Sequence, residues 1–164
     1  MLKNIIKTSN KLLLSLCVLS LTILVFITVI DVFGRYLLNS PLPGATEITE
    51  IILGLLIYIG LPYICKNEGH VSVSLFSNYL NGSLLKIQRA LINLIVSILL
   101  CIIAVQLYRH GIDLNFYNEI TTYLEIPKAP LAFSMALLTM LASLTALFNS
   151  YEYLFNQKVF IKNE

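Results

Sequence analysis

Four long apolar runs, charged only near their ends, constrain this chain more than any other feature. They cover about residues 12–37, 47–65, 84–108 and 130–151. Each has about the 20 residues that a helix needs to cross a bilayer. Strands of a membrane barrel alternate apolar and polar residues, whereas these runs are apolar on all sides. The sequence therefore predicts an all-α integral membrane protein, with four transmembrane helices in one membrane domain over residues 1–164.

The composition excludes several other classes of protein. Apolar residues make up 57% of the chain and charged residues 12%, against about 45–50% and about 25% in soluble domains. A chain of this length cannot bury so many apolar side chains in one small core. A soluble enzyme, a disordered tail and a nucleic-acid binder are thus excluded, and a net charge of +2 does not indicate a polyanionic partner.

Basic residues predict how the helices are oriented. Eight of the 11 lysines and arginines lie before the first run, on either side of the loop between the second and third runs (Lys66, Lys86 and Arg89), or after the fourth; the other three are Arg35, Arg109 and Lys128. By the positive-inside rule both termini are cytoplasmic. Residues 1–30 also resemble a signal peptide, but their apolar part is too long and bulky for one, so we expect an uncleaved signal anchor.

Proline, glycine and short amphipathic stretches predict the connections. Residues 41–44, Pro-Leu-Pro-Gly, form a tight turn, and Pro62 is expected to kink the second helix. In residues 75–80 the apolar side chains recur at helical spacing and polar side chains lie between them. This pattern predicts a short interfacial helix on the cytoplasmic side. The outer loop over residues 111–128 mixes aromatic and acidic residues and is expected to lie along the membrane surface.

Cysteines and histidines predict no metal site and no cofactor. The three cysteines, Cys17, Cys65 and Cys101, form no clustered pair, so structural zinc and disulfide exchange are not indicated. His70 is expected in the cytoplasmic loop and His110 at the outer end of the third helix. About 30 Å of hydrocarbon separates these positions, so one haem iron cannot take both.

The charges at the outer ends of the first two helices are the main candidate site. Asp31 and Arg35 are four residues apart and share a helix face, while Glu47 and Glu50 open the second helix, where carboxylates favour the helix dipole. We expect one arginine to face up to three carboxylates here. This arrangement permits two interpretations: local pairing and capping, or a docking surface for a charged partner outside the membrane.

Small and weakly polar residues form a stripe on each of the last two helices. Such stripes let helices approach closely in lipid. They would hold this bundle together or serve a larger membrane subunit, and the sequence does not separate the two. The stripes are Asn93, Ser97, Cys101 and Ala104, and Thr139, Ala142, Ala146 and Asn149.

Several of these segments together resemble the small membrane subunit, DctQ-like, of TRAP (tripartite ATP-independent periplasmic) transporters. They are Asp-Val-Phe-Gly-Arg-Tyr at 31–36, Asn39, Pro-Leu-Pro-Gly at 41–44, Glu47 and Glu50, and Gly-His-Val-Ser-Val at 69–73. Their order relative to the four helices carries the resemblance over nearly the whole chain. Ser74 departs from it, because family members often have an aspartate there.

The resemblance implies a non-catalytic partner of a large membrane subunit in the bacterial inner membrane. That subunit would hold the substrate and sodium sites, and a periplasmic binding protein would deliver organic acid anions such as dicarboxylates, keto acids or sialic acid. The small subunit would brace the large one. Asp31, Arg35, Asn39, Glu47 and Glu50 would organise the outer end, and Gly69 and His70 the cytoplasmic loop, where the histidine makes a structural hydrogen bond rather than handling protons.

Two other functions stay open at this point. One is a self-sufficient small transporter that acts as a homo-oligomer of four-helix chains. The other is a membrane enzyme or redox anchor. No charged residue is predicted at the bilayer midplane, where ion-coupled carriers usually place ionisable or unwound polar groups, which favours the scaffold.

Overall fold

The computed structural model describes residues 2–66 and 83–155. These residues form four helices: α1 (Leu2–Leu37), α2 (Ala45–Lys66), α4 (Ser83–Phe116) and α5 (Ala129–Phe155). All four are long and apolar enough to cross a membrane. For the described residues, the prediction of an all-helical fold with four helices that can span a membrane is therefore confirmed. The expected interfacial helix, Gly69 and His70 lie outside the described residues.

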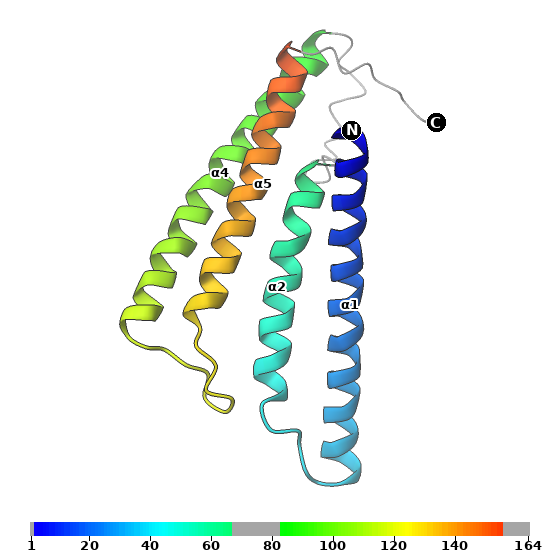
Figure 1. Cartoon of the computed structure of the whole chain (residues 1–164), viewed down its shortest axis with the longest axis vertical. Coiled ribbons are helices and arrows are strands. Elements are labelled where there is room, and N and C mark those ends of the chain that lie inside the picture. Colours follow the sequence, from blue (N-terminus) through cyan, green and yellow to red (C-terminus); the bar gives the residue numbers. More distant parts are fainter. Residues whose placement is uncertain (1, 67–82, 156–164) are drawn as a thin grey trace.

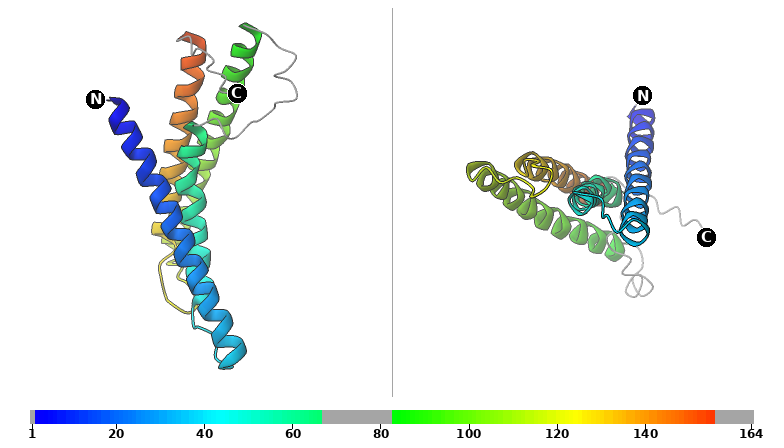
Figure 2. Two further views of the ribbon diagram at one scale, coloured as in Figure 1. Left: turned by 90° about the vertical axis from the view of Figure 1, so that its right-hand side faces the viewer. Right: turned by 90° about the horizontal axis from the view of Figure 1, so that it is seen from below.

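The helices stand side by side in the order α1, α2, α5, α4 (Figures 1 and 2). Neighbours along the chain are antiparallel, so the connections at 38–44 and 117–128 lie at one end of the bundle, at the bottom of Figure 1. We call this the loop end. The opposite end, which carries the start of α1 and the end of α5, is called the terminal end.

α4 is longer than the sequence predicts. The expected helix ends at about residue 108, whereas α4 continues to Phe116 and includes the first part of the expected loop. The continuation packs against the start of α5: Leu114 is buried with Ala129 and Ala132, and Gly111 lies against the ring of Phe133. Charged residues ended the apolar run in the sequence, but they lie on the exposed side of a helix that does not stop there.

α1 packs on α2 through one narrow face. The residues of this face are partly buried, while the residues between them are exposed from residue 12 onward. Their spacing alternates between three and four residues, the 3.5-residue period of coiled-coil packing. The remaining faces of α1 present bulky apolar side chains outward. The packed residues are Leu13, Cys17, Ser20, Leu24, Ile27, Asp31 and Gly34.

α4 and α5 pack through small residues that allow a close approach. Most residues of the two predicted stripes are buried between them, including Ser97, Ala104, Thr139 and Ala142. α2 joins this pair from the other side of α5, where Cys65 packs in the same cluster as Ala142. The stripes therefore hold this chain together, and their buried members are not available to a larger subunit.

Candidate functional site

Asp31 ties the end of α1 to the turn that follows it. One carboxylate oxygen accepts a hydrogen bond from Arg35 Nη2 at 2.9 Å, and the other accepts one from the backbone N–H of Leu42, also at 2.9 Å. The Asp31 side chain is 15% exposed and that of Arg35 is 55% exposed. Asp31 thus caps the turn over residues 38–44, and Arg35 reaches over it towards solvent or headgroups.

Asn39 contributes to the same turn through its backbone. It has a left-handed conformation (φ 49°), which asparagine tolerates better than most residues and which ends the helix. The carbonyl of Gly34 then accepts hydrogen bonds from the N–H groups of Leu38 and Ser40. A Cβ on Gly34 would lie 2.8 Å from the Ser40 carbonyl oxygen, so this close return of the chain requires glycine.

Glu47 binds a different partner from the one expected. Its carboxylate accepts hydrogen bonds from the backbone N–H groups of Tyr123 (2.6 Å) and Leu124 (3.0 Å). Glu50 is exposed, and the ion pair of Arg35 within the described residues is with Asp31. The structure therefore separates the four predicted charges into an Asp31–Arg35 pair, a Glu47 clamp on a distant loop, and an exposed Glu50.

The segment held by Glu47 is an ordered hairpin, and we call residues 117–128 the hairpin loop. Thr121 N donates to the Ile126 carbonyl at 2.9 Å, and Lys128 N donates to the Glu119 carbonyl at 3.0 Å. The side chains of Glu119 and Lys128 lie 3.5 Å apart as an exposed ion pair. These bonds fix the shape of the hairpin loop. The loop therefore couples Glu47, on α2, to the start of α5.

A second clamp lies at the terminal end. Asn149 Nδ2 donates to the backbone carbonyl of Cys65 at 2.8 Å and approaches that of Lys66 at 3.5 Å. The last carbonyls of a helix have no intrahelical donor, so α5 caps the end of α2. The next residue, Ser150, donates to the Ala90 carbonyl of α4 at 2.8 Å. Two adjacent residues of α5 thus join it to both neighbours.

A reciprocal serine contact joins α4 and α5 between the ends. Ser97 Oγ donates to the Ser143 carbonyl at 3.0 Å, and Ser143 Oγ donates to the Ser97 carbonyl at 2.9 Å. Both side chains are buried. Ser97 belongs to the predicted stripe, but no pattern in the sequence distinguishes Ser143 or Ser150 from the other serines.

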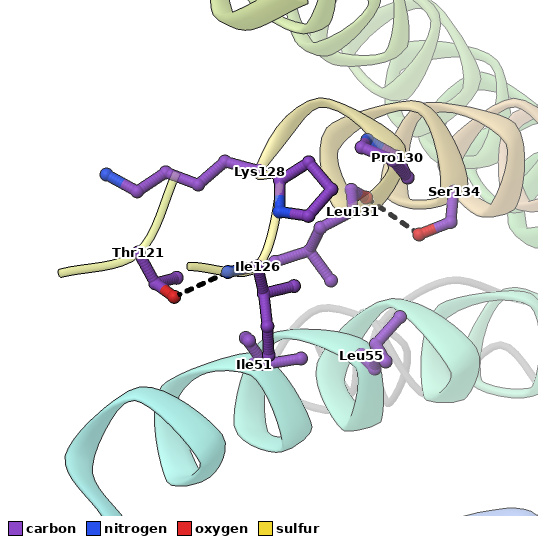
Figure 3. A pocket seen from close by; sticks show the side chains of 9 residues that line it. Ile51, Leu55, Thr121, Ile126, Lys128, Pro130, Leu131 and Ser134 are labelled. Atoms are coloured by element: carbon purple, nitrogen blue, oxygen red, sulfur yellow. Dashed lines mark hydrogen bonds between the residues drawn. The ribbon is translucent and has the colours of Figure 1, made fainter. Parts of the chain in front are cut away.

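Between the two clamps, α2 and α5 leave a cleft of about 330 Å³ near the loop end (Figure 3). Ile51 and Leu55 of α2 form one wall, and Leu131 of α5 forms the other. The hairpin loop contributes Ile126. The lining is mostly apolar, with Thr121, Lys128 and Ser134 as its polar members, and it is shared by the loop-end parts of α2 and α5 and the hairpin loop.

No group of three or more His, Cys, Asp or Glu side chains in residues 2–66 and 83–155 is placed to hold a metal ion. His110 is exposed near the loop end, and Cys65 packs against small apolar residues. Apart from the Asp31–Arg35 and Glu119–Lys128 ion pairs, the polar contacts described above are made to backbone amides and carbonyls, which is typical of structural contacts.

Residues 24–155 match the family of tripartite ATP-independent periplasmic transporters, DctQ component. The matched region runs from the middle of α1 to the end of α5, and so includes Asp31, Glu47, Ser97 and Asn149. No curated protein matches the sequence.

Proposed function

The chain belongs to the DctQ component family of the TRAP transporters, and from this we propose that it is a rigid brace for the large membrane subunit of a sodium-coupled importer. The substrates would be organic acid anions of the dicarboxylate, keto acid or sialic acid class. A periplasmic binding protein would deliver them to the membrane subunits. In this proposal the small subunit holds neither the substrate nor the sodium ion.

The observation that carries the proposal is the fixing of α2 to α5 at both ends. Glu47 binds the hairpin loop at the loop end, and Asn149 binds the last turn of α2 at the terminal end. The Ser97–Ser143 contact fixes α4 to α5 between them. A brace must keep its shape while the attached subunit moves, and the buried polar contacts of Asn149, Ser97 and Ser143 between helices supply such rigidity.

The distribution of polar groups supports a role without an ion pathway. Carriers place ionisable or unwound polar groups near the midplane, where they bind the ion or substrate. Here Ser97 and Ser143 satisfy each other, and Thr139 donates to the carbonyl of Met135 in its own helix. These side chains have their hydrogen bonds within the chain, which favours packing over coordination of a transported ion.

The outward faces of α1 are the surface that we assign to the large subunit and to lipid. Val18, Val25 and Phe26 on these faces are between 56% and 64% exposed. Among the described helices, α1 makes extensive contact only with α2. A second membrane protein can therefore bind along α1 without disturbing either clamp.

We further propose that the protein lies in the bacterial inner membrane with both termini in the cytoplasm. The terminal end would then face the cytoplasm, and the loop end, with Arg35, Glu50 and the hairpin loop, would face the periplasm. The excess of basic residues near the terminal end supports this orientation. Arg35 and Glu50 are exposed at the loop end and are the charges that we assign to contact with the binding protein.

Reconstitution in proteoliposomes tests the function. We expect sodium-driven uptake of a labelled organic acid when this chain, the large subunit and the binding protein are all present. We expect none from this chain alone, and none from the full set after the sodium gradient is collapsed. Uptake by the chain alone would contradict the proposal and support the homo-oligomeric transporter.

A further inference from the structure

The cleft between α2 and α5 has walls suited to hydrocarbon. Ile51, Leu55 and Leu131 line it, and all three lie within candidate membrane spans. A wall of this kind offers water too few hydrogen-bond partners to hold it. In a bilayer, the group of matching polarity present at the highest concentration is a lipid acyl chain.

A cationic side chain, that of Lys128, lies beside the end of the cleft nearest the loop end. Lys128 lines the cleft, and its side chain runs along the hairpin loop in the direction in which α2 begins, with the loop between it and Ile51 and Leu55 (Figure 3). α5 begins at the next residue, Ala129, and has no acidic residue in its first turn. Its N-terminal dipole is therefore not neutralised by its own side chains. α2 differs, because Glu47 lies in its first turn.

The Lys128–Glu119 ion pair leaves the lysine able to bind an anion. The two charged groups are 3.5 Å apart, and both side chains are close to half exposed. Exposed pairs of this kind contribute little stability. An ammonium group has three donors, so Lys128 can retain Glu119 and also bind a phosphate oxygen.

We propose that this cleft is a phospholipid site, with one acyl chain between α2 and α5 and an anionic headgroup phosphate on Lys128. The apolar wall and the cation lie in the order in which a lipid presents its chain and its headgroup at the membrane surface. The lipid would complete the contact of α2 with α5 between the two clamps. This inference does not depend on the transport function.

Native mass spectrometry of the delipidated full chain, titrated with dioleoyl phosphatidylglycerol, tests the site. Lys128→Gln removes the cation at an exposed position and is expected to weaken binding by on the order of tenfold. Ser134→Leu fills the cleft, since Ser134 lines it and its hydroxyl bonds only within α5, to the Leu131 carbonyl. We expect this variant to lose the bound lipid.

Two matched variants control for charge and for added volume. Lys86→Gln removes a cation from the start of α4, at the terminal end. Thr28→Leu adds apolar volume on an exposed face of α1, at a residue whose hydroxyl also bonds within its own helix. Both are expected to bind phosphatidylglycerol like the unmodified chain.

Three further measurements decide the outcome. Dioleoyl phosphatidylcholine should bind more weakly than phosphatidylglycerol and should be insensitive to Lys128→Gln, and soluble glycerol phosphate should not displace either lipid. Equal phosphatidylglycerol binding by the unmodified chain, Lys128→Gln and Ser134→Leu would overturn the proposal. Loss of the lipid when the chain binds a large membrane subunit would also overturn the proposal, because it would show that the subunit, not a lipid, fills the cleft.

Discussion

Asn149 on α5 donates a 2.8 Å hydrogen bond to the backbone carbonyl of Cys65 in the last turn of α2. Asn149 is 5% exposed and Cys65 is fully buried. A helix end inside a membrane protein needs donors for its last carbonyls. Here a neighbouring helix supplies one, so the position of α2 along the bundle is coupled to that of α5.

Replacement of Asn149 tests this coupling. Asn149→Leu keeps a similar size but removes the donor to a buried carbonyl, and we expect it to lower the free energy of unfolding by about 1–3 kcal/mol. The measurement is unfolding in SDS titrations of the protein in detergent micelles. Asn93→Leu is the control, because Asn93 Nδ2 bonds the Arg89 carbonyl within α4. Equal effects of the two substitutions would contradict a cap between helices.

Glu47 is expected to control the hairpin loop. Glu47→Gln replaces one of the two carboxylate oxygens facing Tyr123 N and Leu124 N with a group that donates. Loss of one such bond is worth about 1.5–3 kcal/mol, so amide hydrogen exchange at residues 122–125 should become at least about tenfold faster. Glu50→Gln, at an exposed position, should leave exchange unchanged. Unaltered protection in Glu47→Gln would rule out the clamp.

The two glycines Gly44 and Gly60 are expected to respond oppositely to alanine. Gly44 has a φ of 74°, and a Cβ there would lie 2.8 Å from Leu124 Cγ; Gly44→Ala should therefore be destabilising by about 1–3 kcal/mol. Gly60 is helical with nothing near its added Cβ, so Gly60→Ala should be neutral or stabilise by up to about 1 kcal/mol. The melting temperatures of the two variants in detergent give the comparison. A melting temperature unchanged by Gly44→Ala would show that the turn does not pack on the hairpin loop.

A double-mutant cycle measures the serine contact. Each hydroxyl donates to a backbone carbonyl that either substitution leaves in place, so the cycle measures the contact between the two hydroxyls, whose oxygens lie 3.3 Å apart. Through this contact Ser97→Ala and Ser143→Ala should be coupled by about 0.6–1.7 kcal/mol, the range for hydrogen bonds between membrane helices. A cycle of Ser97→Ala with Thr28→Ala should be additive, because Thr28 bonds the Leu24 carbonyl in its own helix. Additive effects of Ser97→Ala and Ser143→Ala would mean that the two serines pack without a significant mutual hydrogen bond.

The four helices were predictable because bilayer thickness demands long apolar runs, and the charges that end such runs are visible in the sequence. The end of α4 was not, because packing of Leu114 on α5 extends the helix past Arg109 and Asp113. Charged residues end an apolar run without ending the helix.

The Asp31–Arg35 pair was predictable from a four-residue spacing. The partner of Glu47 was not, because Tyr123 lies 76 residues away and offers only a backbone N–H, which any residue would present. For the same reason the partners of Asn149, which belongs to the predicted stripe, and of Ser150 were not predictable, because their acceptors are backbone carbonyls. The 3.5-residue pattern on α1 was a usable signal, since it places Asp31 on the face that packs against α2.

The central claim, that α2 and α5 form one rigid frame, is tested most directly by a distance measured between them in the assembled transporter. Spin labels at Ile57→Cys on α2 and Leu137→Cys on α5, both exposed positions, would be placed in a chain without its native cysteines. Pulsed electron spin resonance should give one unchanged distance without sodium, with sodium, and with substrate and binding protein. A second distance that appears with sodium or substrate would contradict the account, because it would make this chain a moving part of the transporter.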